Sequence, residues 1–452
     1  MANKDLHDFL ALVEEKGQLV RVRKEISPEY EISALSKKVM DQHGPALLFE
    51  HIKGHPDWQL VCNLTGTKPR AALIFDAPVE RTAEVYMERL ANSTPCKQVT
   101  SQEAPVKERM FLGDKVDLEE IPILNHFAGE PAFITLGIVI ARDPDSGLYN
   151  WSVHRLQRKG KNKLGILISP YQLWMIQQKA ERKGQPLEVA VSIGNHPLDV
   201  VAAISMVPFE VEEPELAGAL RGEPLEVVKA ETVDLEVPAR AEAIIEGRVP
   251  AGVLEEEGPF GEFSGYYAQP GLRPIIEVSG ITRRKKPIYL GHLEGGTIMS
   301  RNMAAFGREG PILEACRRVS PKVRAVSCCT PVVGWCVISM KKEREGEQKN
   351  VMAAAISVDA YIKQCMVVDE DVDVFNPIEA LWAFSFRVNP ERDITIIPGM
   401  WLSPLDPTSN QGTSAKVLID ATVPLAEDAS RFKRVEIPAE VNERIRIEDY
   451  LP

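Results

Sequence analysis

The chain has 452 residues, 44% of them hydrophobic, which predicts a multi-domain globular protein with buried cores. Its formal net charge of -12 argues against a nucleic-acid-binding protein, and the short basic cluster at residues 283–286 is too small to change this. No apolar run reaches the roughly 18 residues of a membrane span, and Asp5 near the start does not fit a signal peptide. We therefore expect a cytoplasmic protein without nucleic-acid or membrane partners.

The seven cysteines are scattered along the chain and form no Cys-x-x-Cys pair. An odd number of dispersed cysteines is typical of a reducing compartment, where buried thiols behave as small hydrophobic side chains. Zinc and iron-sulfur sites need closer ligand spacing than these residues offer. We therefore expect neither a cysteine metal site nor a catalytic cysteine.

Residues 1–105 are predicted to form an α/β domain. Apolar runs at residues 47–49, 60–62 and 72–75 alternate with polar stretches that suit helices. The segment at 103–105 and the polar turn after it mark a linker. An amphipathic helix that Gly17 can end opens the chain, with apolar residues at three- and four-residue spacing: Leu6, Phe9, Leu10 and Val13.

Residues 106–305 are predicted to form a β-rich domain, because short β-branched runs are separated by regular turns. This pattern is typical of a sheet or a small barrel. Two helical insertions are expected, at residues 171–182 and at residues 215–220 after Pro214. The predicted strands are 134–141, 150–156, 164–168, 189–193 and 275–279.

Residues 306–452 return to strands that alternate with helices, which favours a parallel α/β sheet. Helices are predicted at about 311–319 and 350–358. The tail from Pro438 onward is charged and suits a helix that docks on a partner subunit. Strands are expected at 325–329, 335–340 and 364–368.

A turn with two spaced glutamates is the most informative motif. Gly258, Pro259 and Gly261 disfavour helix and central strand, so Glu257 and Glu262 are expected on a loop that sets their separation. Two carboxylates that share a site cannot both ionise freely, and the one that stays protonated is a usable general acid. The alternative is a solvated acidic turn, because Glu257 ends a run of three glutamates.

Six motifs in order along the chain resemble the UbiD-type decarboxylase family. Each is modestly specific alone, but their common order makes a chance match improbable. The resemblance implies that residues 106–305 form a split β-barrel that binds prenylated flavin mononucleotide (prenylated FMN), between α/β domains at 1–105 and 306–452. The motifs are Asp-Lys-Val-Asp-Leu at 114–118 with Ile-Pro at 121–122, Asn-Trp-Ser-Val-His-Arg at 150–155, Glu-Pro-Glu-Leu-Ala-Gly at 213–218, the turn at 257–267, Val-Val-Asp-Glu-Asp-Val-Asp-Val at 367–374, and Leu-Asp-Pro at 405–407 with Lys416 and Ile-Asp-Ala-Thr at 419–422.

The resemblance also implies a metal and cofactor site. A divalent metal, typically Mn2+, is implied between the flavin phosphate and Asn150, Gln172 and Glu213. The family has a histidine where this chain has Gln172, although an amide oxygen can bind a hard ion. A potassium ion is implied nearby, partly on carbonyl groups near Trp151 and at residues 205–206. The implied cofactor-binding residues are Asn150, Trp151, Ser152, Arg155, Gln172, Ser205, Met206, Glu213 and Lys416.

Lys416 has a separate argument. Residues 408–416 offer hydroxyl groups, N–H groups around Gly412 and one ammonium group, which suits an anion-binding nest or, alternatively, a polar surface loop. In the family a lysine at this place meets the cofactor phosphate. The resemblance therefore assigns that role to Lys416.

The resemblance assigns catalysis to three residues, Arg155, Glu257 and Glu262. A buried guanidinium beside two carboxylates lowers one pKa and holds the pair in a fixed network, whereas the alternative is an arginine that reaches solvent. A regular strand would place Asn150 and Arg155 on opposite faces, so a bend or strand end must lie between them. His126 and His154 are expected to be hydrogen-bonded structural residues.

Substrate contacts are implied at Ile168 and Phe263, which match apolar wall positions for a flat unsaturated ring. They are also implied at His292 and Arg301, in the glycine-rich stretch at 291–310, where Arg308 is equally compatible with a surface charge. A cation there can bind a second carboxylate or a ring heteroatom, which favours a small heteroaromatic diacid such as furan-2,5-dicarboxylate. Phenolic, pyrrole, cinnamate-like and polyprenyl-hydroxybenzoic acids are open alternatives.

The sequence thus predicts a carboxy-lyase that reversibly decarboxylates an aromatic, heteroaromatic or α,β-unsaturated acid. The resemblance implies a covalent adduct with prenylated FMN and protonation by Glu262 after carbon dioxide leaves. It also implies a homo-oligomer, either a dimer or a trimer of dimers, and a flavin prenyltransferase as cofactor supplier. The alternative is a non-catalytic UbiD-like subunit of a larger carboxylase assembly, which Gln172 would favour if metal and cofactor are lost.

Overall fold

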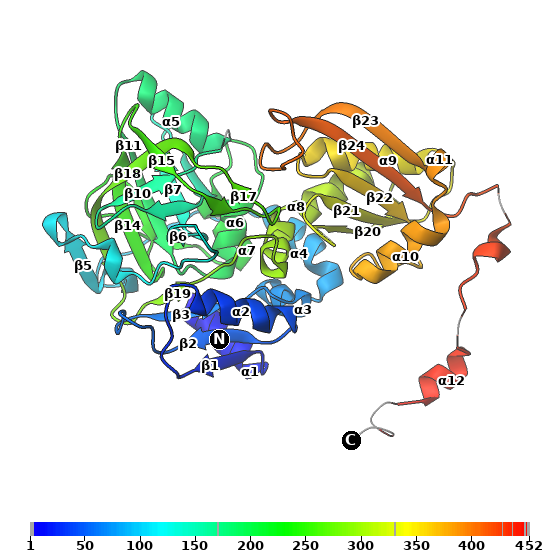
Figure 1. Cartoon of the computed structure of the whole chain (residues 1–452), viewed down its shortest axis with the longest axis horizontal. Helices are drawn as coiled ribbons and strands as arrows, with labels where there is room; N and C mark the ends of the chain where they lie inside the picture. Colours follow the sequence, from blue (N-terminus) through cyan, green and yellow to red (C-terminus); the bar gives the residue numbers. More distant parts are fainter. Residues whose placement is uncertain are drawn as a thin grey trace.

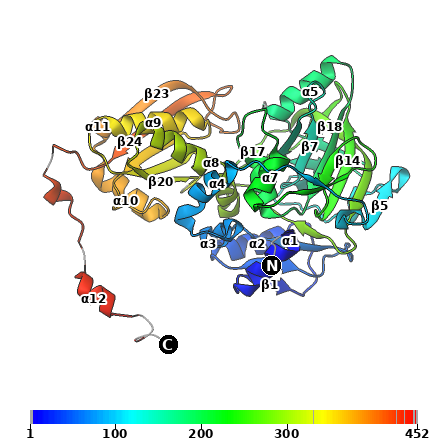
Figure 2. The same ribbon diagram turned by 180° about the vertical axis from the view of Figure 1, so that it is seen from behind.

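The computed structural model describes residues 4–169, 171–329, 331–426, 428–435, 437–446 and 449. The chain forms three α/β parts, with the N-terminal part packed under the central one and the C-terminal part beside it (Figure 1). A tail that carries helix α12 (Ala439–Arg444) runs away from this body, as both views show (Figure 2). Within the described ranges, no helix combines the length and apolarity of a membrane span.

The N-terminal part is a four-stranded sheet with helices packed on it. The predicted opening helix is confirmed as α1, whose four apolar residues are buried and whose N-cap Asp5 accepts a hydrogen bond from the Asp8 amide. The apolar run at 72–75 is helical, because it continues a short helix capped by Thr67. The elements are α1 (Leu6–Glu15), β1 (Leu19–Val22), α2 (Glu31–Asp41), β2 (Ala46–Phe49), β3 (Gln59–Cys62), α3 (Lys68–Ala72), η1 (Leu73–Phe75) and α4 (Thr82–Leu90).

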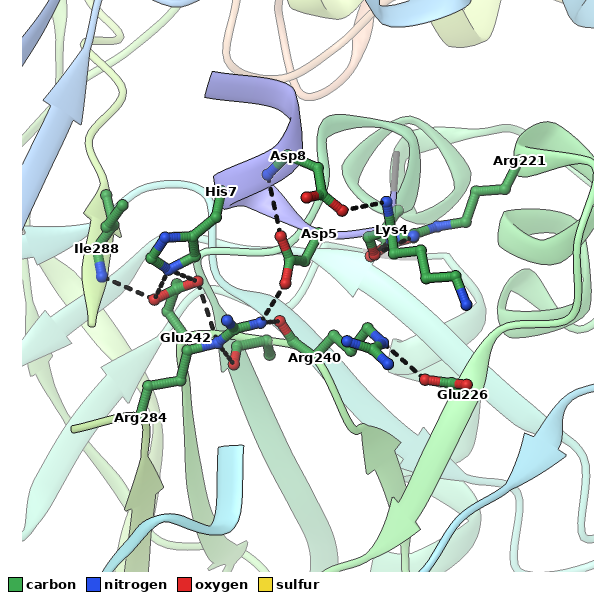
Figure 3. A network of polar contacts seen from close by, with 12 residues as sticks. Lys4, Asp5, His7, Asp8, Arg221, Glu226, Arg240, Glu242, Arg284 and Ile288 are labelled. Atoms are coloured by element: carbon green, nitrogen blue, oxygen red, sulfur yellow. Dashed lines mark hydrogen bonds and ion pairs between the residues drawn. The ribbon is translucent and has the colours of Figure 1, made fainter. Parts of the chain in front are cut away.

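A buried ionic network joins helix α1 to the central part (Figure 3). Glu242 is fully buried, and its carboxylate lies 3.0 Å from His7 Nε2 and 3.3 Å from Arg284 Nε. The same carboxylate accepts a hydrogen bond from the Ile288 amide at 2.9 Å, and Arg284 also donates to Asp5 at 2.8 Å. Strand β19 (Ile288–Leu290) then pairs in parallel with β3, so a central segment completes the N-terminal sheet.

His7 is expected to make protein stability depend on pH. The hydrogen bond to Glu242 raises the pKa of His7 above its usual value, despite partial burial. The resulting stabilisation is complete below the unfolded-state pKa of about 6.5 and disappears as the pH rises through the folded-state pKa. His7→Gln should therefore lower the free energy of unfolding at pH 6, by less than about 1 kcal/mol because His7 is partly exposed.

Urea unfolding at pH 6 and pH 9 measures this effect. Its control is His51→Gln, because His51 is exposed. An equal loss of stability in His7→Gln at both pH values would contradict the charge-based account.

The central part is built on a sheet of ten strands, of which eight follow the order β6-β9-β10-β18-β14-β11-β7-β8. Strands β5 and β15 both add to the long strand β18, and no pairing in the described chain joins β6 to β8. The predicted β-rich region is therefore present as an open sheet. Both predicted helical insertions are found, as α5 and α7, whereas the sequence pattern did not predict the helix at Pro197–Ile204. The strands are β5 (Arg109–Leu112), β6 (Phe133–Ile134), β7 (Ile138–Arg142), β8 (Tyr149–Val153), β9 (Leu156–Arg158), β10 (Lys163–Ile166), β11 (Leu187–Ile193), β14 (Ala243–Val249), β15 (Leu254–Glu257) and β18 (Gly271–Arg283).

Smaller elements surround this sheet. A three-stranded sheet has the order β13-β12-β4, and a short hairpin is formed by β16 and β17. Helix α5 runs along the sheet at the edge of the molecule (Figures 1 and 2). These elements are β4 (Lys97–Gln98), α5 (Gln172–Arg182), α6 (Pro197–Ile204), α7 (Glu213–Arg221), β12 (Glu226–Lys229), β13 (Glu236–Pro238), β16 (Phe260–Gly261) and β17 (Tyr267–Ala268).

The C-terminal part is a five-stranded mixed sheet in the order β20-β21-β22-β24-β23. The predicted parallel pairing holds for β21 with β22 and for β22 with β24, whereas both edge strands run antiparallel to their neighbours. The elements are α8 (Ile298–Val319), β20 (Val323–Cys328), β21 (Trp335–Met340), α9 (Glu347–Val358), β22 (Gln364–Val368), α10 (Pro377–Arg387), α11 (Pro390–Asp393), β23 (Ile394–Trp401) and β24 (Thr413–Ala421).

Helix α8 lies between the central and C-terminal parts and crosses the boundary predicted at residue 305 (Figure 2). The prediction that this helix begins near residue 311 is wrong, because it begins at Ile298 and contains Pro311. Glycines disfavour a helix interior by propensity, but here packing requires them. A Cβ atom on Gly307 would lie 3.0 Å from the carbonyl oxygen of Ile204, at the end of α6.

Candidate active site

Arg155, Glu257 and Glu262 form one buried cluster. The Arg155 guanidinium donates two hydrogen bonds to Glu257, at 2.8 and 2.7 Å, and a third to Glu262. The guanidinium also lies 4.9 Å from the ring centroid of Phe260, which closes the cluster on one side. Side-chain exposure is 6% for Arg155, 1% for Glu257 and 9% for Glu262, so the cluster is shielded from water.

Local backbone breaks bring these residues together. Strand β8 ends at Val153 and β9 begins at Leu156, so Arg155 lies in a strand connection rather than on the regular alternation that starts at Asn150. Glu257 ends β15, and Glu262 follows the two-residue strand β16. The buried carboxylate of Glu130 holds the turn, because it accepts hydrogen bonds from the backbone amides of Gly261, His126 and Phe127. No sequence motif pointed to Glu130.

Glu262 lies where two cavities meet. One cavity has a volume of about 260 Å³ and the other about 620 Å³, and residues of the central and C-terminal parts line both. Arg155 and Glu262 line both cavities, whereas Glu257 lines neither. Burial raises the pKa of Glu262 to about 7, although the nearby Arg155 charge opposes this rise. Glu262 can therefore carry a proton to a bound molecule near neutral pH, and Glu257 holds the arginine.

Asn150, Gln172 and Glu213 form a second polar cluster. Asn150 Nδ2 donates to Gln172 Oε1 at 2.9 Å and to Glu213 Oε1 at 3.2 Å. Asn150 lies on β8, and Gln172 and Glu213 are the first residues of α5 and α7. The backbone amide of Trp151 donates to Glu213 at 2.8 Å, and Ser152 Oγ donates to Asn150 Oδ1 at 3.3 Å. The structure therefore brings together the three predicted metal ligands.

The donor set of this cluster fits a hard divalent cation. Glu213 is 2% exposed, and no lysine, arginine or histidine of the described chain forms an ion pair with it. Burial raises the pKa of Glu213 to about 7, although the hydrogen bonds from Trp151 and Asn150 oppose this rise. The carboxylate and amide oxygens are ligands that Mn2+ or Mg2+ accepts. The described residues hold no group of three His, Cys, Asp or Glu side chains suited to a metal, so a cation at this cluster would depend on the two amide oxygens as well as on Glu213.

Two predicted site residues lie elsewhere. The ammonium group of Lys416, on β24, is 3.2 Å from the carbonyl oxygens of both Ile356 and Asp359, and this buried residue lines neither cavity. Arg301 donates to the Pro331 carbonyl group and also lines neither cavity. Both cations thus contact carbonyl groups of the protein, and the phosphate role of Lys416 and the substrate role of Arg301 stay predictions.

The remaining predicted residues divide between the two cavities and their surroundings. Phe263 and His292 line the smaller cavity, and Ile168 lines the larger one. Ser205 and Met206 directly follow α6; the Ser205 hydroxyl donates to the Val201 carbonyl group, and Met206 is exposed.

Helix α8 sends a different arginine into the smaller cavity. Its residues that line the cavity are Ser300, Met303, Ala304 and Arg308. Arg301 lies seven residues before Arg308, close to the same face of the helix, but its guanidinium donates to the Pro331 carbonyl group. Arg308 Nη1 lies 3.6 Å from Asp359, and the guanidinium stacks 4.1 Å from the Tyr361 ring centroid.

His154 contacts the smaller cavity but has two protein partners. Its Nδ1 lies 2.9 Å from the Leu167 carbonyl oxygen, and its Nε2 lies 2.9 Å from Ser152 Oγ. Burial lowers the pKa of His154 to about 4, so the ring is neutral near pH 7. This agrees with the prediction of a hydrogen-bonded structural histidine.

Three domains of one protein family together match most of the chain. They are the 3-octaprenyl-4-hydroxybenzoate carboxy-lyase N-terminal domain over residues 10–90, the Rift-related domain over residues 97–297 and the C-terminal domain over residues 301–421. Together with the buried acid described above, they define a carboxy-lyase. The chain belongs to the UbiD family of decarboxylases.

Named relatives and solved structures agree with this family. An anhydromevalonate phosphate decarboxylase from Methanothermobacter thermautotrophicus is 34% identical, with 95% of this chain and 99% of the relative covered. A phenolic acid decarboxylase from Bacillus subtilis is 32% identical, with 95% and 94% covered. The UbiD-class enzyme HmfF from Pelotomaculum thermopropionicum, in complex with FMN, is 41% identical with a TM-score of 0.94 and covers 99% of this chain and 100% of its own. An evolved dimeric form of HmfF in complex with prFMN is 40% identical with a TM-score of 0.90 and the same coverage.

Proposed function

We propose that the protein reversibly decarboxylates an aromatic, heteroaromatic or α,β-unsaturated carboxylic acid with prenylated FMN, and that Glu262 is the proton donor. The observation that carries this proposal is the position of Glu262, a carboxyl group with a pKa of about 7 that is held by Arg155 where two cavities meet. A general acid works best when its pKa lies near the working pH.

Each residue of the cluster has a chemical task. Loss of carbon dioxide from an unsaturated carbon leaves charge that needs an electron sink, which prenylated FMN supplies when bound. Arg155 orients the reacting carboxylate and keeps Glu257 and Glu262 in one network. Glu262 donates a proton to the carbon that loses the carboxyl group, and the surrounding side chains exclude water from that transfer.

The cofactor would be held by the central part, in the arrangement that the family describes as a split β-barrel. Asn150, Gln172 and Glu213 would hold Mn2+ or another hard divalent cation, and their oxygen donors and the uncompensated Glu213 charge support this. A potassium ion near Trp151 and residues 205–206 belongs to the same proposal. So do the cofactor role of Ser152 and a flavin prenyltransferase as supplier.

Glu213→Gln is expected to reduce the divalent metal retained by the purified protein at least tenfold. The substitution removes the only negative charge of the Asn150–Gln172–Glu213 cluster and leaves a side chain of the same shape. Metal content by mass spectrometry after removal of free ions measures this effect. Glu210→Gln is the control, because Glu210 is exposed. Unchanged metal content in Glu213→Gln would refute the assignment of the metal site.

Co-expression with a flavin prenyltransferase, followed by purification without oxygen, tests the proposed function. We expect a protein that absorbs visible light and releases carbon dioxide from at least one acid of a panel of aromatic, heteroaromatic and unsaturated acids. Colourless protein without carbon dioxide release would favour the second candidate, a non-catalytic subunit of a carboxylase assembly. The observation that favours this second candidate is Gln172, which stands in the metal cluster where the family has a histidine.

The extended tail supports a proposed homo-oligomer, either a dimer or a trimer of dimers (Figure 1). Helix α12 lies away from the body of its own chain and is therefore available to a second copy. The dimeric relative described above is consistent with this assembly.

A further inference from the structure

A carboxylate that is not part of the acid cluster faces the smaller cavity. Glu294, in the loop between β19 and α8, accepts a hydrogen bond from Ser300 Oγ at 2.5 Å. Its other oxygen lies 3.2 Å from His292 Nε2. All three residues line the cavity, and the Glu294 side chain keeps 23% of its surface accessible. In the described chain Glu294 has no lysine or arginine within ion-pair distance.

The loop holds Glu294 in a fixed place. Thr135 Oγ1 donates to the His292 carbonyl group at 2.7 Å, and Thr297 Oγ1 donates to the Leu293 carbonyl group at 2.6 Å. After Glu294 the chain turns through two glycines with φ near +70°, and a Cβ atom on Gly295 would lie 2.5 Å from Phe127. Glu294 is therefore positioned before any ligand arrives, as a specificity group requires.

Glu294 brings an acceptor and a negative charge to the cavity. Burial favours the neutral form, but hydrogen bonds from His292 and Ser300 outweigh it and hold the pKa of Glu294 below its usual value. An ionised carboxylate has about four acceptor positions, and only two are used here. Glu294 can thus accept a hydrogen bond from a ligand but cannot donate one.

The two arginines that line this cavity have acidic partners other than Glu294. Arg155 is committed to Glu257 and Glu262 by three hydrogen bonds. Arg308 pairs with Asp359, with Nη1 3.6 Å from that carboxylate, and stacks on the Tyr361 ring. A second carboxylate of a substrate would therefore meet a like charge at Glu294, whereas a hydroxyl or ring N–H group would find an acceptor.

We propose that Glu294, held by His292 and Ser300, selects unsaturated monoacids that carry a hydrogen-bond donor and rejects dicarboxylic acids. The inference rests on the proposed decarboxylase function and names its substrate class. It differs from the expectation of a heteroaromatic diacid, which depended on cations at His292 and Arg301; His292 lines the cavity but pairs with Glu294, and Arg301 does not line the cavity. His292 contributes by orienting Glu294 rather than by binding a second carboxylate.

The test uses acids that differ only in the group offered to Glu294. Pyrrole-2-carboxylate carries a ring N–H group, furan-2-carboxylate has an oxygen in that position, and furan-2,5-dicarboxylate adds a second carboxylate. The three hydroxybenzoate isomers, compared with benzoate, offer the donor at other positions. For the cofactor-loaded enzyme we expect kcat/KM for the best donor-bearing acid to exceed that of its matched acid at least tenfold. We expect the dicarboxylate to be the poorest substrate.

Glu294→Gln should reduce that preference to about threefold or less and raise kcat/KM for the dicarboxylate. Ser300→Ala, which keeps the carboxylate, should preserve the order of the acids. A wild-type enzyme without preference for donor-bearing acids, or an equal loss for every acid in Glu294→Gln, would overturn the proposal. The second result would mean that Glu294 acts on the acid Glu262 and not on substrate choice.

Failure of the proposed function can be distinguished from failure of this inference. If the cofactor-loaded protein releases carbon dioxide from no acid, the decarboxylase proposal fails. Calorimetric binding of the same acids to cofactor-loaded wild-type protein and Glu294→Gln then still decides the role of Glu294. Binding of the dicarboxylate that is as tight as that of the donor-bearing acids would overturn it.

Discussion

Replacing Glu262 by Gln is expected to lower kcat for decarboxylation by about 10³-fold while the cofactor stays bound. The amide has nearly the same shape and can still accept the hydrogen bond from Arg155, but it has no acidic proton to give. Glu257 does not replace it, because that carboxylate is bound to Arg155 through both oxygens and lines neither cavity. Carbon dioxide release and the visible spectrum of the purified variant measure activity and cofactor content separately.

The pH profile provides an independent check on Glu262. Since the group must carry its proton to act, the wild-type rate should be highest below pH 7 and fall as the pH rises through about 7. Glu256→Gln is the matched control, because Glu256 belongs to the same acidic run but is exposed. Its rate and pH profile should equal those of wild type. Normal turnover in Glu262→Gln would refute the assignment of the acid.

Arg155→Ala is expected to abolish activity and to lower the free energy of unfolding by about 3–5 kcal/mol. The substitution removes the donor of three buried hydrogen bonds and leaves two carboxylates next to each other in a site that water barely reaches. Arg155 also opposes the burial that raises the pKa of Glu262, so its loss should raise that pKa further. Urea unfolding and carbon dioxide release measure the two effects.

Two further substitutions make the Arg155 result specific. Arg155→Lys keeps the charge but cannot form the forked contact with Glu257, so an intermediate loss of activity and stability is expected. Arg23→Ala removes an arginine from an exposed pair with Glu50 and should change stability by less than about 1 kcal/mol. Wild-type stability in Arg155→Ala would show that the buried network does not hold this part of the fold together.

Several elements could be predicted because their signals are local. Helix α1 followed from apolar spacing alone, and the edges of β21 and β22 followed from short apolar runs between turns. The start of α8 could not be predicted in this way. Glycines disfavour a helix, so the sequence pattern predicted a loop here. In the structure Gly307 allows the α8 backbone to approach the end of α6. The addition of β19 to the N-terminal sheet is likewise a long-range pairing without a local signal.

The sequence by itself determined the family, the order of the motifs and the candidate acid turn, because these depend on residue types at short spacing. Only the tertiary structure decided which charges meet. It brought Arg155 to Glu257 and Glu262 across about one hundred residues of chain, and it joined Asn150, Gln172 and Glu213 from one strand and two helix starts. It also committed Lys416 and Arg301 to carbonyl groups and placed Glu294 in the cavity. Contact, burial and charge pairing depend on where residues lie in space. Residues far apart in the chain make these contacts, so their local spacing does not predict them.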